Sequence, residues 1–332
     1  MAKGLISILP VDPLPALLGF ADEALTYFVR RDLMDLPVGP IEDLWKNSTA
    51  RQLISKQQTD GFWSYGGQTD PPSIPGQNYS LLETYRCLRV LVERYGFNNR
   101  HPAIQKTADY IFSCQTTDGD IRGIISNQYM PYYHGAILEL LLKAGYSEDQ
   151  RVLSGLEWLL STRQDDGGWI VPAQAIPPAQ RIDAFWSGKP VEIAGARPHS
   201  HLATGMALRA FAASPAYRTR PEVIAAGNCL KTRLFEADKY NDRKAPFYWL
   251  KFQFPFWWTS LVSALDTLSY LGFPSGDIDI ARGLDWFITH QEVDGLWSTG
   301  YEKGRKALEN RCWVGLAVCR LINRYEQVEP GQ

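Results

Sequence analysis

The sequence predicts an all-α protein built as a closed ring of helical hairpins, and three observations support this. A short motif recurs along the chain, apolar residues are spaced as they are on helices, and short loops alternate with long ones. Alternating runs of β-branched residues, which are typical of strands, are scarce. A chain of 332 residues suffices for one such ring, so we expect a single domain over residues 1–332.

The recurring motif is a glutamine followed by Asp-Gly and, one residue later, by Trp or Ile. It occurs as QTDGFW at 58–63, QTTDGDI at 115–121, QDDGGW at 164–169 and QEVDGLW at 291–297. The last interval leaves room for a degenerate copy at 229–242. In a turn after a helix, Asp accepts backbone N–H bonds and Gly adopts positive φ. We therefore expect Asp60, Asp166 and Asp294 to be structural.

Helical spacing of apolar residues predicts two kinds of helix. The more apolar kind, expected to line the inside of the ring, falls near 14–34, 77–95, 131–144, 199–213, 256–272 and 309–325. The more polar kind, expected on the outside, falls near 40–57, 101–114, 148–163, 221–235 and 277–290. The two kinds alternate along the chain, which is the order that a ring of hairpins requires.

Loop lengths predict which face of the ring is functional. Connections after the inner helices are short, whereas those after the outer helices are long and hold most of the glycine and proline. All loops of the second kind lie on one face, which also receives the positive N-terminal ends of the inner helices. Long loops are more often functional than short ones. We expect a cavity to open on this face, with the long loop 165–198 over its mouth.

The overall charge argues against a nucleic-acid-binding protein. The formal net charge is −2 at pH 7, and lysine and arginine form no long run that would bind phosphates. The first apolar run is too short for the core of a signal peptide, and no run reaches the about 18 apolar residues of a membrane-spanning helix. The five cysteines are scattered, as free thiols are. We expect a cytoplasmic protein.

The repeated motif, followed each time by an inner helix, resembles the QW repeat of the terpenoid cyclase and protein prenyltransferase superfamily, as in squalene–hopene cyclase-like proteins. The resemblance covers roughly residues 50–325 and implies an (α/α)6 toroid, a barrel of helical hairpins, with an isoprenoid-type substrate. The DxDD motif of class II cyclases and the DDxxD motif of class I enzymes are absent. Asn310-Arg311-Cys312 has Asn where the zinc motif of the prenyltransferases has Asp.

Without a DxDD motif, an acid/base reaction needs another proton-transferring group, and three histidines are candidates. His199 and His201 flank Ser200 at the predicted start of an inner helix, and His134 lies at the start of another. Histidine titrates near neutral pH and serves as a general acid or base. The alternative interpretation is that Ser200 caps the helix and that the histidines are bound by the backbone.

Asp118 and Asp120 are the other catalytic candidates. They lie in TTDGDIRG, the copy of the motif that departs from the pattern, because Asp120 stands where the other copies have an uncharged residue. A loop that differs from its structural counterparts is a candidate for a functional role.

Aromatic residues gather near the same helix starts, and their ring faces stabilise a cation without offering a base. The alternative is that they fill the core of the ring. The segment KFQFPFWW at 251–258 is also a candidate for a peripheral membrane contact. We predict substrate contacts from Tyr79, Tyr132, Tyr133, Trp186, Trp257, Trp258 and Trp313.

These observations predict a terpenoid-cyclase-like protein that binds an apolar, isoprenoid-type small molecule and performs acid/base cyclisation or isomerisation without a metal or cofactor. Two alternatives stay open. One is a zinc-dependent prenyltransferase-like enzyme, with His134, His199, His201 and Cys312 as ligands. The other is a non-catalytic binding module on the same scaffold. The sequence leaves the oligomeric state open.

Overall fold

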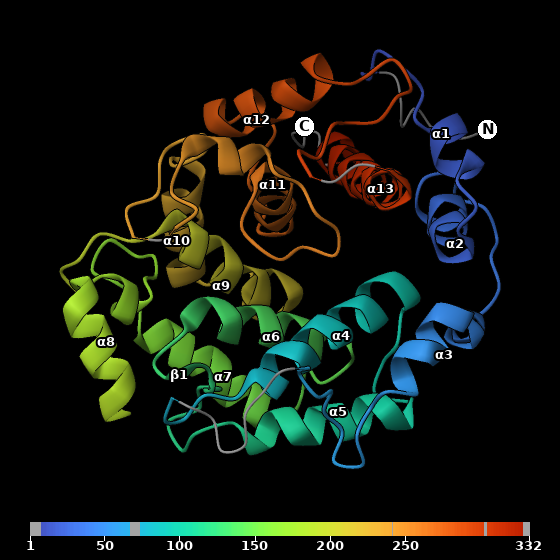
Figure 1. Ribbon diagram of the computed structural model, residues 1–332. Coiled ribbons are helices and arrows are strands. Elements are labelled where there is room, and N and C mark those ends of the chain that lie inside the picture. Colours follow the sequence, from blue (N-terminus) through green and yellow to red (C-terminus); the bar gives the residue numbers. More distant parts are fainter. Residues whose placement is uncertain (1–7, 67–73, 241, 302–303, 328–332) are drawn as a thin grey trace.

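The computed structural model describes residues 8–66, 74–240, 242–301 and 304–327, and in these the chain is all-α, as predicted (Figure 1). The one strand among them, β1 (Ile124–Asn127), is short. None of the described helices combines the length and the apolar character needed to cross a membrane.

Six helices form a ring in which each contacts the next, and they correspond to the predicted inner helices. They are α2 (Glu23–Asp32), α4 (Tyr79–Tyr95), α6 (Pro131–Lys143), α9 (His201–Ala213), α11 (Leu261–Tyr270) and α13 (Arg305–Gln327). The contacts run from α2 through α4, α6, α9 and α11 to α13, which returns to α2. A toroid of hairpins predicts this order, and the toroid stays our interpretation of it.

The remaining long helices lie outside this ring, as Figure 1 shows for α5, α7, α10 and α12. The outer helices are α1 (Leu14–Gly19), α3 (Ser48–Ile54), α5 (Pro102–Ser113), α7 (Gln150–Ser161), α10 (Pro221–Lys231) and α12 (Ile278–Thr289). Short 3-10 helices cover Ile41–Lys46, Pro172–Gln174 and Pro246–Leu250.

Local chemistry explains where the helices begin. Side-chain oxygens of Asp22, Asn78, Asp149, Ser200 and Asp277 accept backbone N–H bonds at the first turns of α2, α4, α7, α9 and α12. Such caps satisfy amides that have no partner inside the helix. Other helices begin with proline, whose missing N–H costs nothing at that position.

Several predicted boundaries are wrong. The helix expected over 14–34 is broken into α1 and α2, because Asp22 caps a new helix there. The helix expected over 40–57 begins as a 3-10 helix and restarts at α3, and the one expected over 256–272 begins only at Leu261. The predicted loop 165–198 contains a helix, α8 (Pro178–Ser187), none of whose residues is buried.

In three of the four motif copies, the tryptophan links the turn to the preceding outer helix by a hydrogen bond. The indole N–H of Trp63, Trp169 and Trp297 donates to a main-chain carbonyl ten residues earlier, at distances of 2.7–2.8 Å. Gly61, Gly119, Gly167 and Gly295 of the four motif copies all have positive φ, which costs least for glycine. The motif is therefore a helix-ending turn.

The interior of the ring is filled by the chain itself. Residues 252–258, which we call the central segment, precede α11, and Phe252, Phe254 and Phe256 are buried. Because these side chains face the core, they are not available for the membrane contact considered for this stretch. The segment carries polar carbonyl groups into an apolar interior, and such groups need donors there.

Arginines of the inner helices supply those donors. Arg89 of α4 donates to the Pro255 carbonyl at 3.0 Å, and Arg94 of the same helix donates to the Phe254 carbonyl at 2.8 Å. Arg209 of α9 donates to the carbonyls of Phe256 and Trp257 at 3.2 and 3.1 Å. The central segment is thus held by its backbone from two sides of the ring.

Candidate functional site

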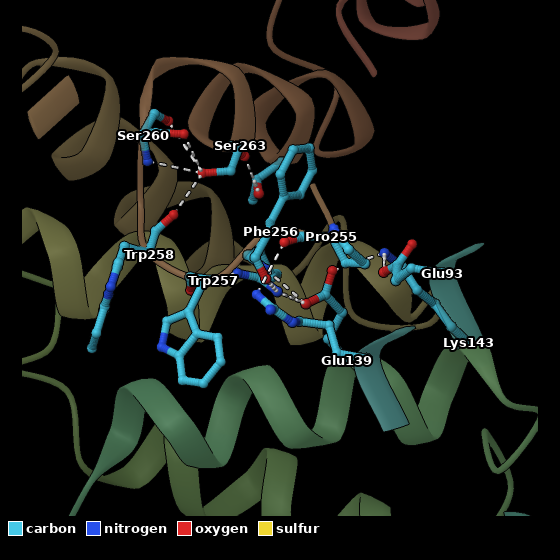
Figure 2. A network of polar contacts seen from close by, with 12 residues as sticks. Glu93, Glu139, Lys143, Pro255, Phe256, Trp257, Trp258, Ser260 and Ser263 are labelled. Atoms are coloured by element: carbon cyan, nitrogen blue, oxygen red, sulfur yellow. Dashed lines mark hydrogen bonds and ion pairs between the residues drawn. The ribbon is translucent and has the colours of Figure 1, made fainter. Parts of the chain in front are cut away.

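A charge network joins three neighbouring inner helices, α4, α6 and α9, next to the central segment (Figure 2). Glu139 of α6 accepts from Arg209 Nε at 2.6 Å and from Lys143 Nζ at 2.8 Å, and Lys143 also binds Glu93 at 2.6 Å. Burial alone would raise the pKa of Glu139, but Arg209 and Lys143 outweigh it and lower that pKa to about 2. This carboxylate is therefore ionised and cannot act as an interior acid.

His134, a predicted catalytic residue, has the contacts of a structural one. Its Nδ1 accepts from the Ile121 N–H at 3.1 Å, and its Nε2 lies 3.0 Å from the Gly155 carbonyl. The first bond requires an unprotonated Nδ1, so Nε2 carries the proton and donates to the Gly155 carbonyl. Burial lowers the pKa of this fully buried histidine to about 4, so it is neutral near pH 7.

Threonines accept the corresponding backbone hydrogen bond in two other copies of the motif. The Trp63 N–H donates to Thr84 Oγ1 at 3.1 Å, and the Trp169 N–H donates to Thr204 Oγ1 at 3.0 Å. Ile121 is the counterpart of these tryptophans, so His134 takes the position of the threonines. Its place at a helix start reflects the repeat, and we leave it out of the candidate site.

The two aspartates of the divergent motif copy are separated by their surroundings. Asp120 is buried and accepts two hydrogen bonds from Arg122, at 2.7 and 3.1 Å, besides one from Thr116. The Asp118 side chain is 65% exposed and lies 3.6 Å from Arg122. Asp120 is therefore paired with a cation, and Asp118 is open to solvent.

His199 is held by the aspartate of its own motif copy. The Asp166 carboxylate accepts from the His199 backbone N–H at 2.8 Å and lies 2.9 Å from Nδ1. Burial alone would raise the pKa of Asp166, but the bonds from His199 outweigh it and lower that pKa. Asp166 also accepts weakly from Gly168 N–H, so the structure gives it the structural role that the sequence predicts.

His201, the first residue of α9, forms the most enzyme-like arrangement. Its Nδ1 lies 3.4 Å from the Asp238 carboxylate, and its ring stacks on Trp249 with centroids 4.5 Å apart. Asp238 also accepts from the Ser200 hydroxyl and from the Leu202 N–H. Ser200 itself accepts from the Ala203 N–H, so the predicted helix cap is confirmed. Sequence reasoning missed Asp238, which lies far along the chain from α9.

Four of the predicted substrate contacts come together with Tyr85 in an aromatic cluster. It consists of Tyr85, Tyr132, Tyr133, Trp257 and Trp258, whose neighbouring ring centroids are 4.5–6.3 Å apart. Tyr132 and Tyr133 begin α6, and the tryptophans end the central segment. Tyr85 is fully buried, whereas Trp257 and Trp258 are partly exposed. The cluster thus reaches from the interior toward the surface.

The other three predicted contacts lie apart from this cluster. Tyr79 stacks on Tyr65, with centroids 5.4 Å apart. Trp313 is fully buried, donates to Asp22 at 3.2 Å and stacks on Phe254. Trp186 is on α8 and is 58% exposed. The packing of Trp313 is that of a core residue.

A cavity of about 530 Å³ lies at the end of the ring where the inner helices finish, opposite the end where they begin. Its lining includes paired charges, such as Arg320 with Asp32 and Lys143 with Glu93. Cations near helix C-termini are favourable, and this pairing explains most of the polar lining. The predicted cavity mouth was on the opposite, long-loop face.

The zinc alternative has no ligand set in the described part of the chain, where no three histidine, cysteine, aspartate or glutamate side chains are placed to hold a metal ion. Both ring nitrogens of His134 have hydrogen-bond partners, and His199 meets Asp166 through Nδ1, whereas its Nε2 has no partner among the described residues. Cys312 is buried in α13, and burial raises its pKa to about 11.

Comparisons with known proteins give a distant structural likeness. No family model and no curated protein matches the chain. Among solved structures, a protein from Actinoplanes is similar over 95% of this chain and 88% of that one, with 16% sequence identity and a TM-score of 0.47.

Proposed function

We propose that the protein binds an apolar, isoprenoid-type molecule at the aromatic cluster and that it is a binding module. The observation that carries the proposal is the cluster itself, in which rings from α4, α6 and the central segment are in continuous contact. Apolar ligands are bound by such aromatic surfaces with a few polar groups among them.

The charges around the cluster argue against carbocation chemistry. The guanidinium carbon of Arg89 lies 4.4 Å from the centroid of the Trp257 ring, and that of Arg243 lies 5.1 Å from the centroid of the Trp258 ring. These cations already occupy aromatic faces that a cyclase would offer to its intermediate. A positive charge formed nearby would be repelled.

The interior carboxylates also fit a binding module better than a cyclase. Protonating an alkene needs a carboxylic acid that stays protonated, which requires a raised pKa. Cations lower the pKa of Glu139 to about 2, and His201 helps to lower that of Asp238 against the opposing effect of burial. Both groups are therefore carboxylates near pH 7.

A second candidate function, an acid/base enzyme for an oxygenated isoprenoid, is favoured by the His201–Asp238 pair. The Asp238 carboxylate lies 3.4 Å from Nδ1 without a hydrogen bond among the described residues. A small closing movement would let it orient the imidazole, so that Nε2 can take or give a proton. Burial lowers the pKa of His201 to about 4, although Asp238 acts in the other direction. The neutral ring would be a base near pH 7.

Ligand titration tests the binding proposal. We expect farnesol to quench the tryptophan fluorescence of the full chain, and Trp258→Ala to weaken binding about tenfold through loss of aromatic contact area. Trp186→Ala is the matched control, because this tryptophan is exposed and apart from the cluster, and it should leave affinity unchanged. No saturable binding by the wild type would refute the proposal.

Product analysis separates the enzyme from the binding module. Incubation of the full chain with farnesol and with an epoxide of farnesol, followed by mass spectrometry, should return both compounds unchanged if the protein only binds. A product that disappears in His201→Gln would instead establish the second candidate. Binding by this variant should persist in either case, because His201 is not part of the aromatic cluster.

A further inference from the structure

Three buried hydrogen-bonding groups at the inner end of the aromatic cluster have no partner at hydrogen-bonding distance among the described residues. They are Nε of Arg89, the hydroxyl of Tyr85 and Nε1 of Trp257. The Tyr85 hydroxyl interacts with Arg209 and the Trp257 indole with Tyr133, both beyond that distance. Buried polar groups are almost always hydrogen-bonded, and leaving one without a partner costs about 1–3 kcal/mol. Three such groups together indicate a site that a ligand completes.

The three groups are neighbours. The Arg89 guanidinium carbon is 4.4 Å from the Trp257 ring centroid and 5.9 Å from that of Tyr85, and the two ring centroids are 5.2 Å apart. Arg89 and Tyr85 are four residues apart on α4, so they lie on one face of that helix. All three groups can donate a hydrogen bond, which selects for an acceptor.

The charge of Arg89 lacks compensation as well. Arg89 is 5% exposed, yet among the described residues it forms no ion pair, and its hydrogen bond goes to the neutral carbonyl of Pro255. The charged neighbours that act on it are Arg209, Arg94 and Arg86, and burial, the largest effect, lowers its pKa to about 10. Arg209, by contrast, has the Glu139 carboxylate.

We propose that the molecule bound at the aromatic cluster carries a carboxylate, and that this carboxylate binds the Arg89 guanidinium and accepts from Tyr85 and Trp257. The inference rests on the proposed function, since the aromatic cluster holds the apolar body of the ligand. An isoprenoid carboxylic acid or a fatty acid has this chemistry.

The number of uncompensated charges selects a carboxylate over a phosphate. One arginine neutralises one negative charge, and a planar carboxylate matches the fork of guanidinium N–H groups. A phosphate near pH 7 carries up to about two negative charges, so part of its charge would stay unpaired. Unpaired charge in a buried site is strongly unfavourable.

The test compares three probes that share one apolar chain: farnesoic acid, farnesol and methyl farnesoate. By calorimetric titration of the full chain near neutral pH, we expect the acid to bind at least about tenfold more tightly than the alcohol or ester, since a charge-assisted bond contributes about 1.5–3 kcal/mol. Arg89→Met should abolish this preference, and Arg89→Lys should keep part of it. Arg86→Met is the control, because Arg86 is exposed and pairs with Glu83.

The outcomes distinguish the two proposals. Equal affinities of the wild type for the acid, the alcohol and the ester would overturn the carboxylate site. The proposal that the cluster binds an apolar molecule would then still stand. No binding of any probe would overturn both. If Arg89→Met does not fold, Tyr85→Phe removes one donor and keeps the phenyl ring. This variant should weaken binding of the acid about threefold to tenfold and leave binding of the alcohol unchanged.

Discussion

His134 makes the stability of the protein depend on pH. Burial lowers the pKa of this histidine to about 4 in the folded protein, whereas an unfolded histidine has a pKa of about 6.5. Protonation of Nδ1 would replace the acceptor of the Ile121 N–H by a second donor. Between these two pKa values, the unfolded chain therefore binds a proton at this residue and the folded chain does not.

The sign and size of the effect follow from linkage. Because the unfolded state binds more protons in this window, the free energy of unfolding falls as the pH is lowered. With these two pKa values, His134 accounts for a loss of about 2 kcal/mol between about pH 7 and about pH 5. The loss reaches about 3 kcal/mol below the folded-state pKa.

Urea unfolding followed by circular dichroism measures this loss in the wild type and in His134→Gln. Glutamine does not titrate, so we expect the variant to lose about 2 kcal/mol less than the wild type over the same pH interval. The pH-dependent loss of unfolding free energy is compared between the wild type and the variant. In this difference, the cost of the substitution itself and the titration of other groups, including His201, cancel. His290→Gln, at an exposed histidine, should behave as the wild type. Equal losses in wild type and His134→Gln would refute the reasoning.

Three further substitutions test the packing by urea unfolding. Trp169→Phe removes the indole donor from the Leu159 carbonyl, which keeps only its bonds from Thr162, and should cost about 1 kcal/mol. Thr204→Val removes the acceptor of the Trp169 N–H and should cost about 1–3 kcal/mol. Arg209→Met leaves Glu139 without its main partner and should cost about 3–5 kcal/mol, part of which Glu139→Gln recovers in the double variant.

Matched controls for these variants come from exposed positions. Trp186→Phe and Thr232→Val make the same chemical changes where the side chains meet water, so each should change stability by less than about 0.5 kcal/mol. Costs as large at the exposed positions as at the buried ones would contradict the roles assigned to Trp169 and Thr204.

Periodicity predicted the helices well because most of them bury one face. The helix over 77–95 was predicted on that basis and is observed at Tyr79–Tyr95. Helix α8 was missed because it buries none of its residues, and its start at Pro177-Pro178 is typical of a loop. The break between α1 and α2 depends on a cap at Asp22, which apolar spacing does not reveal.

The site was harder to predict because its parts are distant in sequence. Tyr132 and Trp258 were singled out separately as aromatic residues, but nothing in the sequence showed that their rings stack. Arg89 looks like a surface residue of an amphipathic helix, and its acceptor is 166 residues further along the chain. An arginine without a carboxylate partner is recognised only when every neighbour is known.

The central segment has a consequence for the order in which the fold is assembled. Arg89 and Arg94 of α4 and Arg209 of α9 donate to carbonyls of residues 254–257, and synthesis delivers those carbonyls after both helices. Until they arrive, the three guanidinium groups lack these acceptors and the interior stays open to water. Hairpins of a linear repeat array are stabilised by their neighbours alone. Here the early hairpins depend on a late stretch of chain, so we expect the ring to fold as one cooperative unit.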